Sequence, residues 1–222
     1  LPKGYHESNE KYPVVYVLDG NRNFGIVAGT AQLLQTGMDA PKVIVVGIGY
    51  KTDEEHAKLR SRDYIPTVSE DLAYSGGASN FLSFLEEELI PNIESSYRVD
   101  SNRLLAGVSY SGLFTLYTLF NKPDLFKNYL IGSPSMYYDN DVIFKHEEDY
   151  ARKYNDLDAN VFLSVGTLEA GFDMFPGMVS NIEKLSKILE NRKYDKLTLT
   201  TCIFENETHF SVIVNGEPPN RL

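Results

Sequence analysis

Ser109 stands in a short segment, Gly107-Val108-Ser109-Tyr110-Ser111-Gly112, that separates two apolar runs. The run before it, residues 104–108, has the composition of a buried strand. The helix predicted for residues 112–120 is apolar on nearly every side, as buried helices are. A sharp turn between a strand and a helix projects a serine hydroxyl above a sheet, where it can act as a nucleophile. The pattern therefore predicts a nucleophile elbow with Ser109 at its apex.

Ser111 departs from the usual elbow, which has glycine at this position. Five-residue patterns of small residues are also common by chance, so the flanking elements decide the interpretation. Because serine is small, and because a strand and a helix can be read on either side, we interpret Ser111 as a tolerated substitution.

His209 is the histidine best placed to serve Ser109 as a general base. Most lone histidines have no catalytic role, but His209 lies in a short polar loop directly after the last predicted strand, residues 197–204. His6, His56 and His146 lie in polar segments, and we interpret them as solvated.

A carboxylate hydrogen-bonded to this histidine would fix the tautomer of its imidazole and stabilise the charged form. Glu169 follows the fifth predicted strand, residues 161–165, and is the candidate that we favour. The other candidate acids are Asp173, Glu205 and Glu207. All four could instead be ordinary surface carboxylates, and a Ser-His pair without a third member is a further alternative.

The negative charge that develops on an attacked carbonyl needs two backbone amides in an oxyanion hole. Tyr110 supplies one by its position after Ser109. The second should come from the loop after the first strand, where Gly20-Asn21 allows a tight turn, although Asp19-Gly20 could be an ordinary turn pair.

Six predicted strands alternate with helices along the chain. The strands cover residues 12–18, 42–48, 104–108, 128–131, 161–165 and 197–204. The helices cover residues 23–35, 79–94 with a kink or break at Pro91, 112–120, weakly 137–158, and a segment marked by Met178, Ile182, Leu185 and Leu189. Residues 52–77 are interpreted as a long loop. Such alternation predicts an α/β fold with a mostly parallel sheet and helices on both faces. Ligands bind beyond the carboxyl ends of such strands, where Ser109, Ser133, Glu169 and His209 all lie.

The composition bounds the class of protein. A chain of 222 residues suits a single α/β domain, residues 1–222, which could be truncated at either end because it begins at Leu1. A formal net charge of −10 argues against nucleic acid and anionic membrane surfaces as partners. Cys202 lies in an apolar and β-branched run and is interpreted as a buried thiol. No apolar run is long enough to insert in a membrane, so we expect a soluble chain, cytoplasmic or exported after signal removal.

Segments along nearly the whole chain resemble the Putative esterase family of α/β-hydrolases. That family includes trilactone siderophore esterases, feruloyl and acetylxylan esterases, S-formylglutathione hydrolases and mycolyltransferases. The Arg-Asp-Tyr-x-Pro-Thr and Glu-Thr-His-Phe-Ser-Val segments most resemble the siderophore-esterase branch. The matching segments are residues 16–21, 45–50, 62–67, 84–97, 106–114, 132–135 and 207–212.

The resemblance implies an α/β-hydrolase fold with Ser109 as nucleophile, His209 as base and Glu169 as acid. It also implies an oxyanion hole formed by the amides of Asn21 and Tyr110. The order Ser, acid, His along the chain is that of α/β-hydrolases. Besides Ser111, one departure is that the chain ends 13 residues after His209, where the family commonly has a closing helix.

The expected function is therefore a serine carboxylic ester hydrolase that forms an acyl-enzyme, without a metal or organic cofactor, on siderophore lactones or on acyl esters of carbohydrates. An acyltransferase and a non-catalytic binding module of the same fold are the alternatives. Substrate-binding candidates are Arg22, Arg62 and Phe172, although Arg62 could instead pair with Asp63. Further aromatic or apolar candidates, which could equally be packing residues, are Tyr110, Tyr137, Tyr138, Met174 and Phe175.

Overall fold

The computed structural model of the 222-residue chain describes residues 1–70, 72–171 and 176–212. It divides into two compact units, Leu1–Ala106 and Gly107–Leu222. The organisation as a single domain stays a prediction, and the two units are described in turn.

The described residues alternate between strands and helices, as the sequence predicts. The strands are β1 (Tyr12–Val17), β2 (Ile44–Gly47), β3 (Val99–Val108), β4 (Asn128–Gly132), β5 (Asn160–Gly166) and β6 (Thr198–Phe204). The helices are α1 (Gly20–Gly37), α2 (Asp53–Tyr64), α3 (Ala78–Phe84), α4 (Ile90–Ser96), α5 (Tyr110–Asn121), α6 (Tyr138–Lys153) and α7 (Met178–Arg192). Short 3₁₀ helices cover Tyr5–Glu7 and Thr167–Gly171, and a π-helical turn covers Leu85–Leu89.

The six strands are ordered β2-β1-β3-β4-β5-β6. The pairs β1–β2, β1–β3, β4–β5 and β5–β6 are all parallel. Strand β3 begins in the first unit and ends in the second. The predicted α/β fold with a parallel sheet is confirmed.

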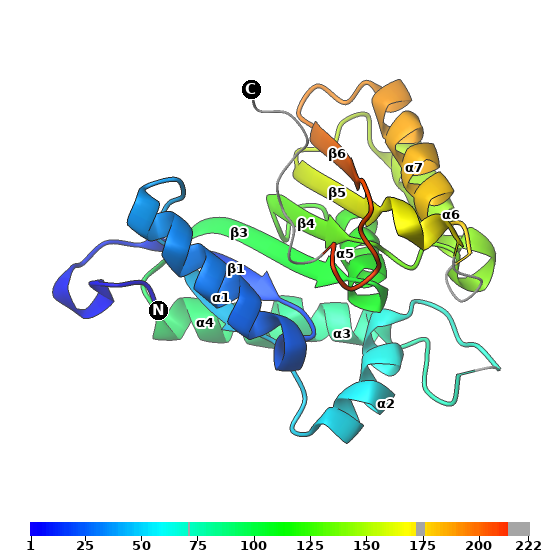
Figure 1. Ribbon diagram of the computed structural model, residues 1–222. Helices are drawn as coiled ribbons and strands as arrows, with labels where there is room; N and C mark the ends of the chain where they lie inside the picture. The colour runs from blue at the N-terminus through cyan, green and yellow to red at the C-terminus, as the bar shows by residue number, and fades with distance from the viewer. Residues whose placement is uncertain (71, 172–175, 213–222) are drawn as a thin grey trace. The chain divides into compact units, whose positions relative to one another are not determined.

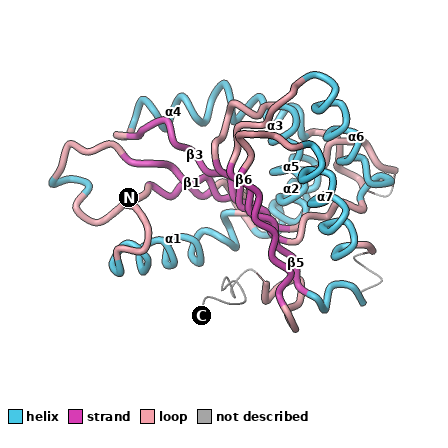
Figure 2. The backbone as a smooth tube through the Cα atoms, turned by 90° about the horizontal axis from the view of Figure 1, so that it is seen from above, coloured by secondary structure: helices cyan, strands magenta, loops and turns pink. Residues whose placement is uncertain are grey.

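In the first unit, helices cover both faces of the strands. Helix α1 packs against β1 and β2, and Figures 1 and 2 show α1 and α4 on opposite sides of β1 and β3. The fully buried side chains of this unit include Tyr16, Leu18, Tyr64, Ile65, Leu85 and Leu105.

In the second unit, α5 packs against β4, and α7 packs against β5 and β6. The apolar character that predicted a buried α5 is confirmed, since nine of its residues are buried. Figure 2 shows α5, α6 and α7 on the same side of β5 and β6. Four candidate site residues follow the carboxyl ends of β3, β4, β5 and β6, respectively: Ser109, Ser133, Glu169 and His209.

The loop predicted for residues 52–77 is wrong in its first half, which forms α2. This helix is polar almost throughout, and its buried residues are His56, Ser61, Asp63 and Tyr64. It has no apolar stripe to reveal it. The local signal is at its start, where the Thr52 hydroxyl accepts a hydrogen bond from the Glu55 amide at 3.1 Å. This is the N-cap interaction of a capping box.

The remaining boundaries differ from prediction in ways that have local causes. Helix α1 begins at Gly20 rather than at residue 23, which places Asn21 in its first turn. The predicted break at Pro91 is confirmed as the π-helical turn Leu85–Leu89 just before it. A proline cannot donate the next backbone hydrogen bond, so the regular ladder is interrupted there.

Candidate functional site

The turn between β3 and α5 holds Ser109 in a strained backbone conformation. Its φ of 63° and ψ of −122° lie in a region that residues with a side chain seldom adopt. Gly107 makes the turn possible, because a Cβ at this position would lie 2.3 Å from the Ser111 carbonyl oxygen. The backbone geometry is that of a nucleophile elbow.

Ser111 replaces the usual glycine without disturbing the turn. Its side chain is fully buried, and its hydroxyl bonds both the amide and the carbonyl of Val108 at 2.8 Å. The hydroxyl therefore satisfies backbone groups on the inner side of the elbow, which explains why a serine fits there.

Glu169 and His209 are joined by a hydrogen bond of 2.7 Å between Oε2 and Nδ1. The glutamate is fully buried and the histidine is 6% exposed. Because Nδ1 is occupied by the carboxylate, Nε2 is the nitrogen left to accept a proton from a nucleophile. Among the other candidate acids, Glu205 is exposed and Glu207 is half-buried, while Asp173 lies outside the described residues.

Two further donors hold the second oxygen of the Glu169 carboxylate. The Ser133 hydroxyl donates to Oε1 at 2.6 Å, and the Gly166 amide donates to the same atom at 2.9 Å. Sequence analysis placed Ser133 at the end of β4 but gave it no role, because its partner lies 36 residues further along the chain.

Ser109 is partly exposed, and its hydroxyl contacts a second serine that the sequence did not single out. The distance between Ser109 Oγ and Ser135 Oγ is 3.4 Å. Among the described residues, no hydrogen bond joins Ser109 to His209. Catalytic hydrogen bonds are often long without substrate and tighten in the complex.

The two amides expected in an oxyanion hole both lie in the first turn of a helix. Tyr110 begins α5, and Asn21 is the second residue of α1. First-turn amides have no acceptor within their own helix and so can bind an anion. Asn21 belongs to the first unit and Tyr110 to the second, so their cooperation in one oxyanion hole stays a prediction.

In the first unit, the Asn21 side chain joins the start of α1 to the loop after β2. Its Nδ2 donates to the Tyr50 carbonyl at 2.8 Å, and its Oδ1 accepts the Tyr50 amide at 2.6 Å. Gly49 lets the two loops approach, since a Cβ there would lie 2.4 Å from Asn21 Oδ1.

The interpretation of His56 as a solvated histidine is wrong. His56 is fully buried, and its Nε2 lies 2.8 Å from Asp19 Oδ1. Arg60 also binds the Asp19 carboxylate through Nε at 2.9 Å and Nη2 at 2.8 Å. This cluster fixes Asp19, whose backbone has a φ of 51°, at the end of β1. Helix α2, which was not predicted from the sequence, supplies both side chains that bind the Asp19 carboxylate.

Arg62 does pair with Asp63, through Nε at 2.7 Å and Nη2 at 3.0 Å. The Tyr50 hydroxyl donates to the same carboxylate at 2.9 Å. Burial and the neighbouring Tyr64 and Asp63 raise the pKa of the Tyr50 phenol, which keeps this donor protonated. Arg22 is exposed, while Phe172 lies outside the described residues.

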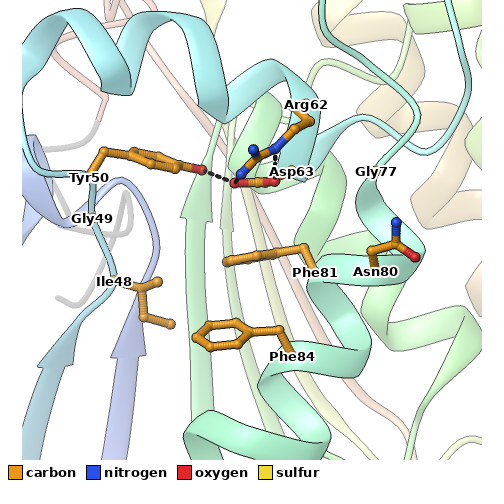
Figure 3. Close-up of a pocket in the computed structure, with 9 residues that line it drawn as sticks. All are labelled: Ile48, Gly49, Tyr50, Arg62, Asp63, Gly77, Asn80, Phe81 and Phe84. Carbon is orange, nitrogen blue, oxygen red and sulfur yellow. Dashed lines mark hydrogen bonds and ion pairs between the residues drawn. The ribbon is translucent and has the colours of Figure 1, made fainter.

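The Arg62–Asp63 pair lies at the edge of a cavity of about 570 Å³ in the first unit. Figure 3 shows Tyr50 and Arg62 pointing at the Asp63 carboxylate, with the rings of Phe81 and Phe84 on another side. The lining residues are Ile48, Gly49, Tyr50, Arg62, Asp63, Gly77, Asn80, Phe81 and Phe84. The cavity thus combines aromatic walls with an ion pair.

Three tyrosines that are candidates for a substrate pocket lie in or next to the first turns of α5 and α6. Tyr110 and Tyr138 make an edge-to-face contact with ring centres 6.4 Å apart. Burial, with a smaller contribution from Tyr110, raises the pKa of the Tyr137 phenol. Met174 and Phe175 lie outside the described residues.

Within residues 1–70, 72–171 and 176–212, no helix is both long and apolar enough to cross a membrane. Across the same ranges, no three histidine, cysteine, aspartate or glutamate side chains gather in a way that could hold a metal ion.

The family model described as "Putative esterase" matches residues 1–205 of the chain. The chain is 34% identical over 218 residues to the ferri-bacillibactin esterase of Bacillus subtilis, which covers 91% of this chain and 75% of that protein. It is 36% identical over 151 residues to the siderophore enterobactin esterase of Emericella nidulans, covering 60% of this chain and about half, 49%, of that protein.

A solved structure, an IroE-like serine hydrolase from Shewanella oneidensis, superposes on the chain with a TM-score of 0.84 at 30% identity. The superposition covers 96% of this chain and 70% of that structure. The likeness in fold extends along nearly the whole chain.

Proposed function

We propose that this chain, which belongs to the Putative esterase family, hydrolyses the ester bonds of siderophores through an acyl-enzyme on Ser109. The chain is a serine ester hydrolase of the α/β-hydrolase fold. The proposal adds to this class the kind of substrate and the role of each residue.

The observation that supports the residue roles best is the Glu169–His209 hydrogen bond of 2.7 Å in the same unit as the strained Ser109. A carboxylate that accepts from Nδ1–H selects the tautomer of the neutral imidazole in which Nε2 is the acceptor, and it orients the ring as a base. The elbow holds the nucleophile on the side of the sheet where the strand ends meet. Together these are the parts that acyl transfer requires.

In the first half of the proposed reaction, Ser109 Oγ attacks the ester carbonyl carbon while His209 Nε2 takes the hydroxyl proton. Glu169 stabilises the imidazolium that forms. The amides of Tyr110 and Asn21 bind the oxyanion of the tetrahedral intermediate. As the intermediate collapses, the bond to the alcohol oxygen breaks, and the imidazolium returns its proton to that alcohol.

In the second half, water replaces the alcohol. His209 takes a proton from the water as its oxygen attacks the acyl carbon, and the second intermediate releases the acid. Ser109 Oγ regains its proton from the imidazolium. The atoms balance as one ester and one water giving one acid and one alcohol.

The substrate class comes from two relatives whose names specify siderophore esters, one bacterial and one fungal. A chain with a formal charge of −10 needs a local cation to bind an anionic ferric siderophore. We assign this role to Arg62, which keeps Nη1 for a ligand while Asp63 binds Nε and Nη2. Arg22 and Phe172 are further candidates.

The test is to incubate the purified chain with a catecholate trilactone siderophore, iron-free and ferric, and to follow ring opening by mass spectrometry. Wild type should release linear and then fragmented hydroxy acids. Ser109→Ala and His209→Ala should be slower by a factor of about 10³ or more. His6→Ala, which changes an exposed histidine, is the control.

Each part of the proposal can fail separately. If p-nitrophenyl esters are cleaved but trilactones are not, the substrate class is wrong while Ser109 keeps its role. If Ser109→Ala remains active, the role of Ser109 is wrong. If an added alcohol receives the acyl group in preference to water, the enzyme is an acyltransferase.

A further inference from the structure

The end of β4 and the loop after it, residues 132–135, are hydrogen-bonded to Ser109 through their backbone. The Ser109 amide donates to the Gly132 carbonyl at 3.1 Å, and the Ser135 amide donates to the Ser109 carbonyl at 3.1 Å. Two residues of this loop thus bond both backbone polar groups of Ser109. The loop also packs tightly on α5, since a Cβ at Gly112 would lie 3.0 Å from the Gly132 carbonyl oxygen.

The Ser135 side chain contacts the reacting atom itself. Ser135 is fully buried, and its Oγ lies 3.4 Å from Ser109 Oγ. A buried hydroxyl is seldom left without a partner. Because the Ser135 backbone is tied to Ser109, its hydroxyl is held at a fixed place beside the nucleophile.

The Tyr137 phenol is a second partner of the Ser135 hydroxyl. Burial chiefly raises the pKa of this phenol, so it keeps its proton at neutral pH. Each hydroxyl has one proton to donate. If Ser109 gives its proton to His209, its Oγ can only accept from Ser135, and Ser135 Oγ can then only accept from Tyr137.

The same loop reaches the other end of the catalytic unit through Ser133. This residue is fully buried with a φ of 39°, its amide donates to the Ser164 carbonyl at 2.7 Å, and its hydroxyl holds Glu169 Oε1 at 2.6 Å. Alternate serines of one short loop therefore contact the nucleophile and the acid, which fixes the two relative to each other.

We propose that Ser135 is a further catalytic residue: it donates a hydrogen bond to Ser109 Oγ and so leaves the Ser109 proton directed to His209. Ser135 forms and breaks no covalent bond. A donor on Ser109 Oγ fixes the side-chain rotamer before attack, and rotamer fixation is part of what places a nucleophile in reactive geometry. This inference rests on the proposed role of Ser109 as nucleophile.

The test separates acylation from the rest of the cycle. The release of p-nitrophenol from p-nitrophenyl acetate is followed by stopped flow, and the burst gives the acylation rate constant and the apparent substrate affinity. Ser135→Ala should lower the acylation rate constant about three- to tenfold, the magnitude of one neutral hydrogen bond, at unchanged affinity. Ser135→Cys keeps a similar volume with a weaker donor. Its acylation rate constant should lie between those of wild type and Ser135→Ala.

Tyr137→Phe provides a second variant that does not touch the nucleophile directly. It should lower the acylation rate constant by less than Ser135→Ala does. The double variant should be no slower than Ser135→Ala alone, because the phenol acts through Ser135.

The matched control is Ser186→Ala, which removes the hydroxyl of another buried serine in the same unit, whose Oγ lies 2.7 Å from Oγ1 of the half-buried Thr201. It should lower the melting temperature and leave acylation unchanged. The inference is overturned if Ser135→Ala acylates within twofold of wild type, or if the Ser135 and Tyr137 effects multiply. A Ser109→Ala variant that still shows the burst would instead overturn the proposed function.

Discussion

Glu169 lies 2.7 Å from His209 although 40 residues separate the two along the chain. The carboxylate accepts from His209 on Oε2 and from Ser133 and Gly166 on Oε1. Each of these three donors therefore binds one defined oxygen of the carboxylate. The orientation of a glutamine side chain at this position can be predicted from them.

Glu169→Gln should keep the fold and lose most of the activity. The Gln oxygen takes the place of Oε1, because Ser133 and Gly166 both donate there. The amide nitrogen then faces His209 Nδ1 and forces it to accept, which puts the histidine proton on Nε2 and removes the base. We expect kcat to fall about 10³- to 10⁴-fold with little change in KM.

Steady-state kinetics with p-nitrophenyl butyrate measure this effect, with Glu205→Gln, at an exposed acid of the same region, as the control. A loss of less than tenfold in Glu169→Gln would mean that another group orients His209.

Gly107→Ala should disrupt the elbow. The added Cβ would lie 2.3 Å from the Ser111 carbonyl oxygen and 2.5 Å from Thr115 Oγ1, which α5 cannot accommodate without moving. We expect a loss of at least about 2 kcal/mol in the free energy of unfolding, in the range of overpacked cores. Activity should fall with it, because Ser109 would shift.

Urea denaturation and ester hydrolysis check this prediction together. Gly25→Ala is the control, since a Cβ there meets nothing within 4 Å and lies inside α1. It should stabilise the chain by about 0.5–1 kcal/mol, the difference in helix propensity. Equal stability for both variants would contradict the prediction.

The elbow could be predicted from sequence because its signals are local. A buried strand, a turn of small residues and an apolar helix are consecutive, and α5 is indeed buried around Ser109. The same holds for His209 and Glu169, whose places after strands suffice to bring them to one edge of a parallel sheet. Once β5 and β6 pair, the residues that follow them come close enough for Glu169 and His209 to form their hydrogen bond.

Asp19, His56 and Arg60 could not be predicted in the same way. Helix α2 buries polar side chains against a buried aspartate, so its face toward the core has no apolar period. The contact between residues 37 positions apart is tertiary, and no residue close to His56 in the sequence reveals it. Ser135 was missed for a related reason, because its partner belongs to the preceding strand-helix turn.

Asp19→Ala should strongly destabilise the chain. The Asp19 side chain is 5% exposed and binds both His56 and Arg60, so its loss leaves a partly buried guanidinium without its counterion. Breaking a buried ion pair by removing one partner typically costs about 3–5 kcal/mol. We expect a loss at the lower end, about 3 kcal/mol, because Arg60 is partly accessible to water.

Chemical denaturation at neutral pH measures the loss, and Glu148→Ala is the matched control. Glu148 pairs with Arg152 where both side chains are more than half exposed. Surface pairs of this kind contribute about 0–1 kcal/mol. If the two variants lose the same stability, the Asp19 cluster has no special structural importance.

Arg62→Gln distinguishes a residue that binds substrate from one that only supports α2. If Nη1 contacts an anionic ferric siderophore, KM for that substrate should rise about three- to tenfold. KM for neutral p-nitrophenyl acetate should stay within twofold. The effect should shrink with added salt, because exposed charges are screened. Some stability should be lost as well, since Asp63 would keep the Tyr50 hydrogen bond but lose its ion pair.

Arg152→Gln removes an equal charge from an exposed site in the other unit and therefore corrects for the change in net charge. A KM for the ferric siderophore that rises as much in Arg152→Gln as in Arg62→Gln would indicate general electrostatic attraction. If Arg62→Gln lowers the free energy of unfolding but leaves KM unchanged for both the siderophore and p-nitrophenyl acetate, Arg62 has only a structural role. Its ion pair with Asp63 already supports such a role. Only a selective rise for the charged substrate in Arg62→Gln assigns the guanidinium to substrate binding.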